Sequence, residues 1–257
     1  MSSIEFKKQE GVAVITLNRP DVFNSFNREM ALAVIAALDD CEVDPNVHVI
    51  VLTGNGKAFC AGQDLNEAIE DNGITFEVIL NEHYNPIISR IRNIEKPVVA
   101  AVNGVAAGAG ANIAFACDFT IANKKASFTQ AFSKIGLVPD SAGTFFLPRL
   151  VGLQRATALM MLSEKLTADE AENIGLIYKA VEVDEYVDFV ANFVERLAKM
   201  PNKALGMTKR LINAGLTNDL ETQLKLEGEL QVEAGNSADY QEGVNAFLEK
   251  RKPTFNQ

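Results

Sequence analysis

Asn103-Gly-Val-Ala-Ala-Gly-Ala-Gly-Ala-Asn112 is the most informative segment of this chain. Small residues from Gly104 to Ala111 allow another group to approach the backbone amides, and the helix that they are expected to open would point its positive dipole end at that group. Such amides can stabilise negative charge developing on an oxygen atom. The alternative interpretation is that the small residues only permit tight helix packing, and spacing alone does not separate the two.

A second segment, Gly136-Leu-Val-Pro-Asp-Ser-Ala-Gly-Thr144, supplies a carboxylate. Between Ala101 and Leu150 the acidic residues are Asp118 and Asp140. Asp140 is therefore the candidate for moving a proton next to amides that hold a carbonyl oxygen. The alternative is a turn or a helix cap, because Pro-Asp-Ser is ordinary turn chemistry.

Hydrophobic patterning predicts a mixed α/β chain. The segment from Gly11 to Leu17 alternates in the manner of a strand, and Asn24-Ser25 is predicted to cap a helix over Phe26 to Cys41. Near-continuous apolar runs predict buried strands, and the segment between the first and second of these runs is predicted to be a helix. The three strands and that helix are Val47 to Leu52, Val98 to Val102, Phe119 to Ala122, and Glu77 to Ile94.

After Pro148 the pattern becomes helical, with Thr167 and Pro201 as start or stop signals. The last third of the chain is therefore expected to be entirely helical. The predicted helices are Arg155 to Leu162, Ala168 to Ile174, Tyr186 to Met200, Asn202 to Ala214 and Leu220 to Ala234.

Composition excludes several classes of protein. The 257 residues are 47% hydrophobic, and 34 acidic against 24 basic residues give a net charge of −10 that argues against nucleic acid or a membrane surface as a partner. The apolar runs are much shorter than the roughly 20 residues of a transmembrane helix. The N-terminus resembles neither a secretory signal nor a transit peptide, so we expect a cytoplasmic protein.

Cysteine and histidine side chains give no sign of a metal site. Cys41, Cys60 and Cys117 are odd in number and lack paired ligand spacing, so we expect no disulfide framework and small, buried side chains at Cys60 and Cys117. His48 and His83 have no acidic or cysteine partner at ligand spacing, which favours packing or solvent exposure for both.

Lys57-Ala-Phe-Cys-Ala-Gly-Gln-Asp-Leu65 adds a second loop of small residues after a predicted strand. Its Phe59 to Asp64 motif and the segment from Lys96 to Gly108 resemble the two marks of the enoyl-CoA hydratase/isomerase (crotonase) superfamily, and the likeness extends from Thr16 to Arg251. The resemblance implies a crotonase-like α/β fold, in which a spiral of ββα units over residues 1–195 carries the CoA and acyl site. Residues 196–257 would form a helical region that packs in a homotrimer or a dimer of trimers.

The resemblance also implies the ligand and the residues that bind it. The substrate would be an acyl-CoA thioester, with coenzyme A as part of the substrate and no prosthetic group or metal. The oxyanion-binding amides would be those of Ala61 and Ala109, and Asp140 would be the acid/base residue. The predicted substrate- and CoA-binding residues are Asn24, Ser25, Phe59, Ala61, Gly62, Gln63, Asp64, Leu65, Gly108, Ala109, Asn112, Phe132, Leu137 and Lys250.

Some positions depart from the superfamily pattern. Family members often have a basic residue before the Asn24 position to meet the CoA phosphates, whereas this chain has Val22-Phe23, so we expect Arg19 or Lys250 to compensate. Asp64 and Asp118 are predicted to be structural. His83 and Tyr84 are candidates for the border of the acyl pocket.

The most informative departure concerns two glutamates that activate water in the hydratases of the superfamily. Their positions match Asn112 and Phe132, neither of which can replace a carboxylate in proton transfer. A single Asp140 fits isomerisation. Within the superfamily the chain most resembles the 1,2-epoxyphenylacetyl-CoA isomerases, through Gly104 to Ala111, Ala131 to Asp140 and Ser237 to Gly243. This resemblance implies formation of oxepin-CoA, with a 3-enoyl to 2-enoyl shift as a further activity.

Other functions stay open at this point. The first alternative is a general enoyl-CoA hydratase or isomerase of fatty-acid β-oxidation, and a hydrolytic or dehalogenating thioester enzyme is another. A non-catalytic scaffold, including an RNA-binding one, is a third, although the acidic charge and Asp140 argue against it.

Overall fold

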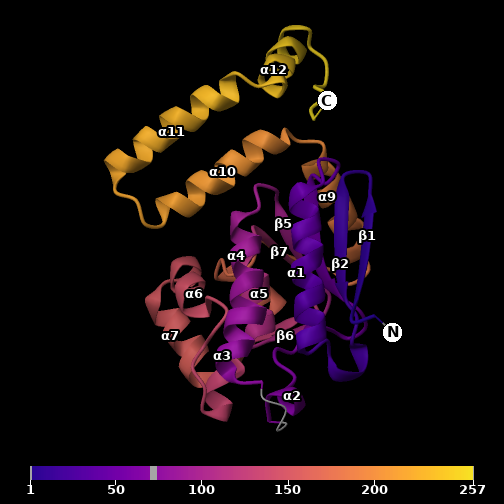
Figure 1. The fold of residues 1–257 in the computed structure, drawn as a ribbon, viewed down its shortest axis with the longest axis vertical. Helices are drawn as coiled ribbons and strands as arrows, with labels where there is room; N and C mark the ends of the chain where they lie inside the picture. Colours follow the sequence, from indigo (N-terminus) through magenta and orange to yellow (C-terminus); the bar gives the residue numbers. More distant parts are fainter. Residues whose placement is uncertain (1, 70–73, 257) are drawn as a thin grey trace.

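The computed structural model describes residues 2–69 and 74–256, and Figure 1 shows an α/β body from which the last helices extend. The strands are β1 Ile4–Gln9, β2 Val12–Leu17, β3 Val49–Gly54, β4 Ala58–Cys60, β5 Val98–Val102, β6 Val105–Ala107, β7 Phe119–Asn123, β8 Ser127–Thr129, β9 Lys165–Thr167 and β10 Lys179–Val181. The α-helices are α1 Arg28–Val43, α2 Leu65–Ile69, α3 Phe76–Val78, α4 Asn85–Asn93, α5 Ala109–Ala116, α6 Gly143–Val151, α7 Leu153–Leu162, α8 Ala168–Asn173, α9 Tyr186–Ala198, α10 Asn202–Gly215, α11 Leu220–Gly235 and α12 Ala238–Leu248. Short 3₁₀ helices cover Pro20–Val22 and Ala131–Ile135, and a π-helical segment covers Ile79–Tyr84.

Two sheets form the frame of the described chain. The larger sheet has the strand order β1-β2-β3-β5-β7-β10, and the smaller one has the order β4-β6-β8-β9. Only β1 with β2, and β8 with β9, pair antiparallel. Along the chain, β3 and β4, β5 and β6, and β7 and β8 each place their first strand in the large sheet and their second in the small sheet, followed by helices. This alternation is the predicted ββα spiral.

Helices cover both faces of the large sheet. One face packs against α9 through a cluster that includes Val49, Val99, Ile121, Phe193 and Leu197. The other face, with inward side chains such as Ile15, Ile50 and Ala100, packs in the main core with α1, α4 and α5. Strands buried on both faces explain the near-continuous apolar runs of the sequence.

The start of α1 differs from the prediction. The helix begins at Arg28 rather than Phe26, and its cap is Asn27, whose Oδ1 accepts the Met30 N–H at 3.0 Å. Asn24 does not cap the helix because its side chain bonds to backbone groups of other loops. Phe26 instead forms a β-bridge with Gln63, which joins this segment to the loop after β4.

The last third is not entirely helical, which corrects the prediction. β9 pairs with β8, and β10 pairs with β7 at the edge of the large sheet. Both strands have three residues, too short for a period to appear in the sequence. Beyond α9, Figure 1 shows α10 and α11 as an extended pair with α12 at the far end of the molecule. The predicted boundary at residue 195 stays a prediction.

The exposed surface of this helical arm is rich in large apolar side chains. Examples are Leu224, Val232, Phe247 and Leu248, each more than half exposed in the single chain. None of the helices described in the structure has both the length and the apolar character to cross a membrane.

Candidate active site

The first part of the site is the loop after β4 and the N-terminus of α5. Gly62 adopts φ +97°, and a Cβ added there would lie 3.1 Å from the Ala107 carbonyl oxygen and 3.7 Å from the Ala109 nitrogen. Gly108, just before the helix, adopts φ 52° and ψ −127°, which a residue with a side chain rarely reaches. These glycines hold the two backbone segments side by side at the positive end of α5.

The free amide of the first loop belongs to Gln63. The Ala61 N–H donates to the Phe23 carbonyl oxygen at 3.0 Å, so it cannot serve as the predicted oxyanion donor without losing that bond. The bridge to Phe26 uses the Gly62 carbonyl and the Asp64 N–H, which turns the Gln63 N–H to the opposite side. Among the described residues, no acceptor binds the Gln63 N–H. We therefore revise the predicted donor from Ala61 to Gln63.

Ala109 provides the second amide. It is the first residue of α5, and in the described part of the chain its N–H has no backbone acceptor. The first N–H groups of a helix lack partners within the helix, so this amide is a ready donor. The opening of α5 is tightly enclosed, since a Cβ on Gly110 would lie 2.5 Å from the Cys60 carbonyl oxygen. The small-residue run thus packs a helix tightly and also leaves amides free, which unites the two interpretations of the sequence.

Asp140 lies on the segment that leads into α6. Its Oδ1 accepts a hydrogen bond from the Ser141 hydroxyl at 2.8 Å, and none of the side chains that the structure describes forms an ion pair with the carboxylate. Burial raises the pKa of Asp140 above its ordinary value, and the bond from Ser141 opposes part of this rise. An uncompensated, partly dehydrated carboxyl group is suited to taking up and releasing a proton.

Asn112 and Phe132 surround the same place. The Asn112 amide donates to the Asp140 carbonyl oxygen at 2.9 Å and is itself buried. The Phe132 ring packs over the start of α5, since its edge would lie 3.7 Å from a Cβ added to Gly108. The structure therefore brings Asn112, Phe132 and Asp140 to the end of α5 that carries the free Ala109 amide.

The surroundings of Asp140 are partly open in the single chain. Val138 is 81% exposed and Leu137 lies at the border of exposure, so neither covers the carboxylate in the single chain. Phe132, in contrast, is buried. Apolar residues that are neighbours in sequence thus diverge, because the segment after the 3₁₀ helix turns outward before α6.

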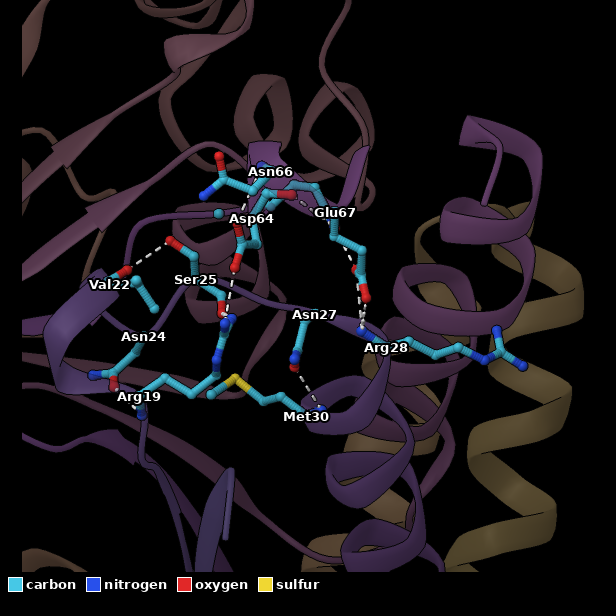
Figure 2. A network of polar contacts seen from close by, with 12 residues as sticks. Arg19, Val22, Asn24, Ser25, Asn27, Arg28, Met30, Asp64, Asn66 and Glu67 are labelled. Carbon is cyan, nitrogen blue, oxygen red and sulfur yellow. Dashed lines mark hydrogen bonds and ion pairs between the residues drawn. The ribbon is translucent and has the colours of Figure 1, made fainter. Parts of the chain in front are cut away.

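The predicted CoA-binding loop is held together by its own polar groups, as Figure 2 shows. Arg19 forms an ion pair with Asp64 (Nη2 to Oδ2, 2.8 Å) and donates to the Ser25 carbonyl oxygen at 2.6 Å. The Ser25 hydroxyl donates to the Val22 carbonyl oxygen at 2.7 Å, and the fully buried Asn24 side chain bonds the Ala58 carbonyl oxygen at 2.8 Å. Asp64 has the structural role that was predicted, and Arg19 is engaged with it.

Two further predicted binding residues do not present their side chains at the Asp64 loop of this chain. Phe59 is fully buried in the core, so its side chain supports β4 and has no exposed surface in the single chain. Lys250 is exposed just after α12, and Figure 1 places that end of the molecule opposite α2 and the Asp64 loop. Within one chain the structure does not bring Lys250 to the site. Leu65, by contrast, begins α2 beside this loop and is half exposed.

Tyr84 connects the Gln63 loop to the π-helical segment. Its hydroxyl donates to Gln63 Oε1 at 2.9 Å, and its ring is fully buried with Phe26 as an edge-to-face neighbour. Burial, and then the nearby groups of Cys60, Asp140 and Glu67, raise the pKa of Tyr84 well above its ordinary value. Sequence reasoning named Tyr84 only as a pocket border, whereas the structure places it as a support for the amide-bearing loop.

The two histidines and Cys60 contact groups that stabilise the fold. His83 is buried with Nε2 3.3 Å from Arg28 Nη1, and burial lowers its pKa. His48 Nδ1 lies 3.0 Å from the Ala198 carbonyl oxygen. Cys60 is buried as predicted, and burial raises the pKa of its thiol to about 12. In the parts of the chain that the structure describes, no cluster of His, Cys, Asp and Glu could hold a metal ion.

The fold places the chain in the class of α/β spiral proteins, with two free amides and a carboxyl group near the start of α5. A family model described as enoyl-CoA hydratase/isomerase matches residues 7–257, and the chain belongs to that family, which acts on acyl-CoA thioesters. The crotonase fold is shared with a solved structure of a putative enoyl-CoA hydratase/isomerase from Mycobacterium abscessus, at a TM-score of 0.93 and 37% identity over 98% of each chain.

Two relatives from bacteria differ in the activity that their names state. A probable enoyl-CoA hydratase of Rhodobacter capsulatus is 46% identical over 98% of this chain and 97% of its own length. The 1,2-epoxyphenylacetyl-CoA isomerase of Escherichia coli K12 is 44% identical over 96% of this chain and 95% of its own length. Similarity therefore establishes the family, and the choice between the two reactions depends on the site.

Proposed function

We propose that this enzyme is a CoA-thioester isomerase that converts ring-1,2-epoxyphenylacetyl-CoA to oxepin-CoA and shifts the double bond of 3-enoyl-CoA to the 2-position. The observation that carries the proposal is the isolated Asp140 carboxyl group, half-buried without an ion-pair partner near the N-terminal end of α5. The similarity to the isomerase of Escherichia coli supports the choice of the epoxide substrate.

The Gln63 and Ala109 amides are proposed to bind the thioester oxygen. Removing an α-proton from the substrate leaves an enolate whose negative charge rests on that oxygen. Two fixed N–H groups at the positive end of a helix stabilise this charge, and the loss of one such donor typically costs about 3 kcal/mol in the transition state. Because only backbone groups are involved, the side chains at these positions can vary.

Asp140 is proposed to carry the proton in the double-bond shift. Its carboxylate takes the proton from C2 of a 3-enoyl-CoA, the electron pairs move to give a dienolate, and the protonated Asp140 returns the proton at C4. The product is 2-enoyl-CoA, and the carboxylate is restored without the addition of water. The epoxide and the oxepin also have identical atoms, so their interconversion needs no co-reactant.

Hydration is disfavoured by what surrounds Asp140. Addition of water needs one group to activate the water and a suitably placed acid to protonate the neighbouring carbon. At the positions that match the two hydratase glutamates, Asn112 spends its amide on the Asp140 carbonyl oxygen and Phe132 packs on Gly108. A single carboxyl group with these neighbours suits isomerisation.

The proposal is tested by incubating the protein, and separately its Asp140→Asn variant, with freshly generated 1,2-epoxyphenylacetyl-CoA. Chromatography and mass spectrometry should reveal a product of unchanged mass that forms only with the parent protein. An epoxide that stays unreacted would redirect the assignment to straight-chain 3-enoyl-CoA. A product heavier by one water would contradict the single-acid mechanism.

A hydratase is the second candidate, because several relatives of this chain are named as hydratases. Besides the Rhodobacter protein, the short-chain-enoyl-CoA hydratase of Clostridium acetobutylicum is 35% identical over 98% of this chain. Crotonyl-CoA would separate the candidates: the isomerase proposal predicts negligible formation of 3-hydroxybutyryl-CoA, while a hydratase forms it readily.

Assembly and CoA contacts complete the proposal. The exposed apolar side chains of α11 and α12 support association into a homotrimer or a dimer of trimers. In such an assembly Lys250 of a second copy would meet the CoA phosphates that it cannot reach within its own chain. Reduced CoA affinity in Lys250→Ala, with unchanged kcat, would support this role of Lys250, and unchanged affinity would remove Lys250 from the site.

The enzyme is proposed to act in the cytoplasm.

A further inference from the structure

A buried series of hydrogen bonds connects the interior to the peptide group of Asp140. The Asn112 amide nitrogen donates to the Asp140 carbonyl oxygen at 2.9 Å, and Asn112 Oδ1 accepts from Gln130 Nε2 at 2.7 Å. The Gln130 carbonyl oxygen accepts from the Ser163 hydroxyl, which lies 2.6 Å from the Ser133 hydroxyl. Asn112, Gln130 and Ser163 are all at most 3% exposed, so water does not compete for the bonds that join these three residues.

The peptide that these bonds hold is an unusual one. Ser141 and Ala142, directly after Asp140, adopt φ values of +50° and +59°, in the left-handed region that residues with side chains seldom occupy. The Asp140 carbonyl oxygen also accepts the Gly143 N–H at 2.9 Å, so two donors meet there. A Cβ added to Gly143 would lie 2.4 Å from Asn112 Nδ2, which shows how closely the segment is seated on α5. Such backbone strain persists only where the surroundings enforce it.

The direction of the Asn112 amide decides whether it can act as this support. Only its nitrogen can donate to a carbonyl oxygen, and a rotated amide would set two oxygens against each other. Gln130 donates to the oxygen end of Asn112, which matches the orientation in which the Asn112 nitrogen faces Asp140. Gln130 thus acts on Asp140 through Asn112, although it does not touch the Asp140 segment by a hydrogen bond itself.

We propose that Asn112 and Gln130 are positioning residues that hold the Asp140 carboxyl group in the place from which it transfers the proton. This inference rests on the function proposed above. The position that carries a water-activating acid in the hydratases would here hold a neutral amide, whose task is to orient the acid of a different segment. A carboxylate at this position would lack the donor and would place a negative charge near Asp140.

Isosteric variants test the inference. Asn112→Asp removes the donor to the Asp140 carbonyl oxygen, and Gln130→Glu removes the donor that orients Asn112. Thr120→Val is the matched control, because the Thr120 hydroxyl donates to the Ala114 carbonyl oxygen of the same helix at 2.7 Å in a buried place. The control loses one buried hydrogen bond of α5 that has no connection to Asp140.

Two readouts are measured on each folded variant. The first is amide hydrogen exchange in the peptide that covers residues 137–146, and the second is kcat, KM and the pH dependence of isomerisation of a 3-enoyl-CoA. In both isosteric variants we expect faster exchange and a kcat lowered by about 10- to 100-fold with KM nearly unchanged. Asn112→Asp should also move the acid limb of the pH profile upward, because a neighbouring negative charge favours protonated Asp140. Thr120→Val should change neither readout.

Different outcomes would refute the positioning role of Asn112 and Gln130 and the isomerase function itself. Faster exchange with an unchanged kcat in both variants would overturn the positioning role, as would unchanged exchange in both. A loss of kcat in Thr120→Val as large as that in Asn112→Asp would also overturn it, because general weakening of α5 would then suffice. An unmodified enzyme that isomerises neither 3-enoyl-CoA nor the epoxide would instead refute the proposed function.

Discussion

The two ends of α5 each have an aspartate beside them, and the two differ in their partners. Beyond the C-terminal end, Asp118 pairs with Arg92 at 3.1 Å and Lys209 at 2.8 Å and accepts the Val98 N–H at 2.8 Å. Near the N-terminal end, Asp140 has the Ser141 hydroxyl as its hydrogen-bond donor. A carboxylate with several charged and backbone partners ties strands and helices together, whereas one left short of partners is available for chemistry.

The largest expected effect concerns Asp140 and sharpens this comparison. Asp140→Asn keeps the shape of the side chain and removes its proton exchange, so we expect isomerase kcat to fall by about 10²- to 10⁴-fold. Because burial raises the pKa of Asp140, its ionised form destabilises the folded state at neutral pH, and this cost disappears below the ordinary aspartate pKa. The variant should therefore melt at a higher temperature than the parent at pH 7 and at nearly the same temperature at pH 3. A lower melting temperature at pH 7 would contradict the isolation of Asp140.

The same change at the other end should give the opposite result. Asp118→Asn leaves the buried Lys209 without its counter-charge, and breaking such a pair typically costs about 3–5 kcal/mol in the free energy of unfolding. Urea unfolding measures this loss, and kcat per folded molecule should stay within about twofold of the parent value. Unchanged stability together with a large loss of kcat would instead assign Asp118 a role in catalysis.

The amide pair is tested through the backbone that presents it. Gly62→Ala adds a Cβ at φ +97° close to the Ala107 carbonyl oxygen, which should displace the Gln63 amide and lower kcat/KM by about 10²- to 10³-fold. Gly11→Ala is the control, because Gly11 has φ +82° and a neighbour at the same 3.1 Å distance, but it lies beside His48. Equal losses of activity in the two variants would indicate general strain instead of a displaced oxyanion donor.

The smallest effect concerns Ser141. Its hydroxyl stabilises the Asp140 carboxylate, so Ser141→Ala should raise the Asp140 pKa further. Since the base form is then lost at higher pH, the acid limb of kcat/KM should move upward, with less than about a tenfold loss at pH 8. A limb that moves downward, or does not move, would mean that another group controls the profile.

Much of the fold follows from sequence because its central strands are long and buried on both faces. The apolar run from Val98 to Val102 has the same bounds as β5, and the small-residue run correctly marks the start of α5. The three-residue strands β9 and β10 carry too little pattern to be seen, and they form only because β8 and β7 offer an edge. Asn27, and not Asn24, caps α1 because tertiary bonds claim the Asn24 side chain first.

The sequence predicted the side chains of the candidate site better than the directions of its backbone amides. Asp140 stood out as one of two acidic residues between Ala101 and Leu150, and in the structure burial raises its pKa. Ala61 was assigned in place of Gln63 because a sequence does not show which way a loop amide points. That direction is set by hydrogen bonds to Phe23 and Phe26. In the sequence, α1, β3 and β4 separate these two residues from the loop. The link from Gln130 to Asp140 likewise joins three segments that no local pattern relates.

The central claim is that one carboxyl group isomerises the substrate without adding water, and labelled water tests it most directly. A 3-enoyl-CoA is incubated with the enzyme and with Asp140→Asn in H₂¹⁸O, and the products are analysed by mass spectrometry. The account predicts a 2-enoyl-CoA of the substrate's mass without ¹⁸O, formed in quantity only when Asp140 is present. Rapid, Asp140-dependent formation of an ¹⁸O-labelled 3-hydroxyacyl-CoA would contradict it.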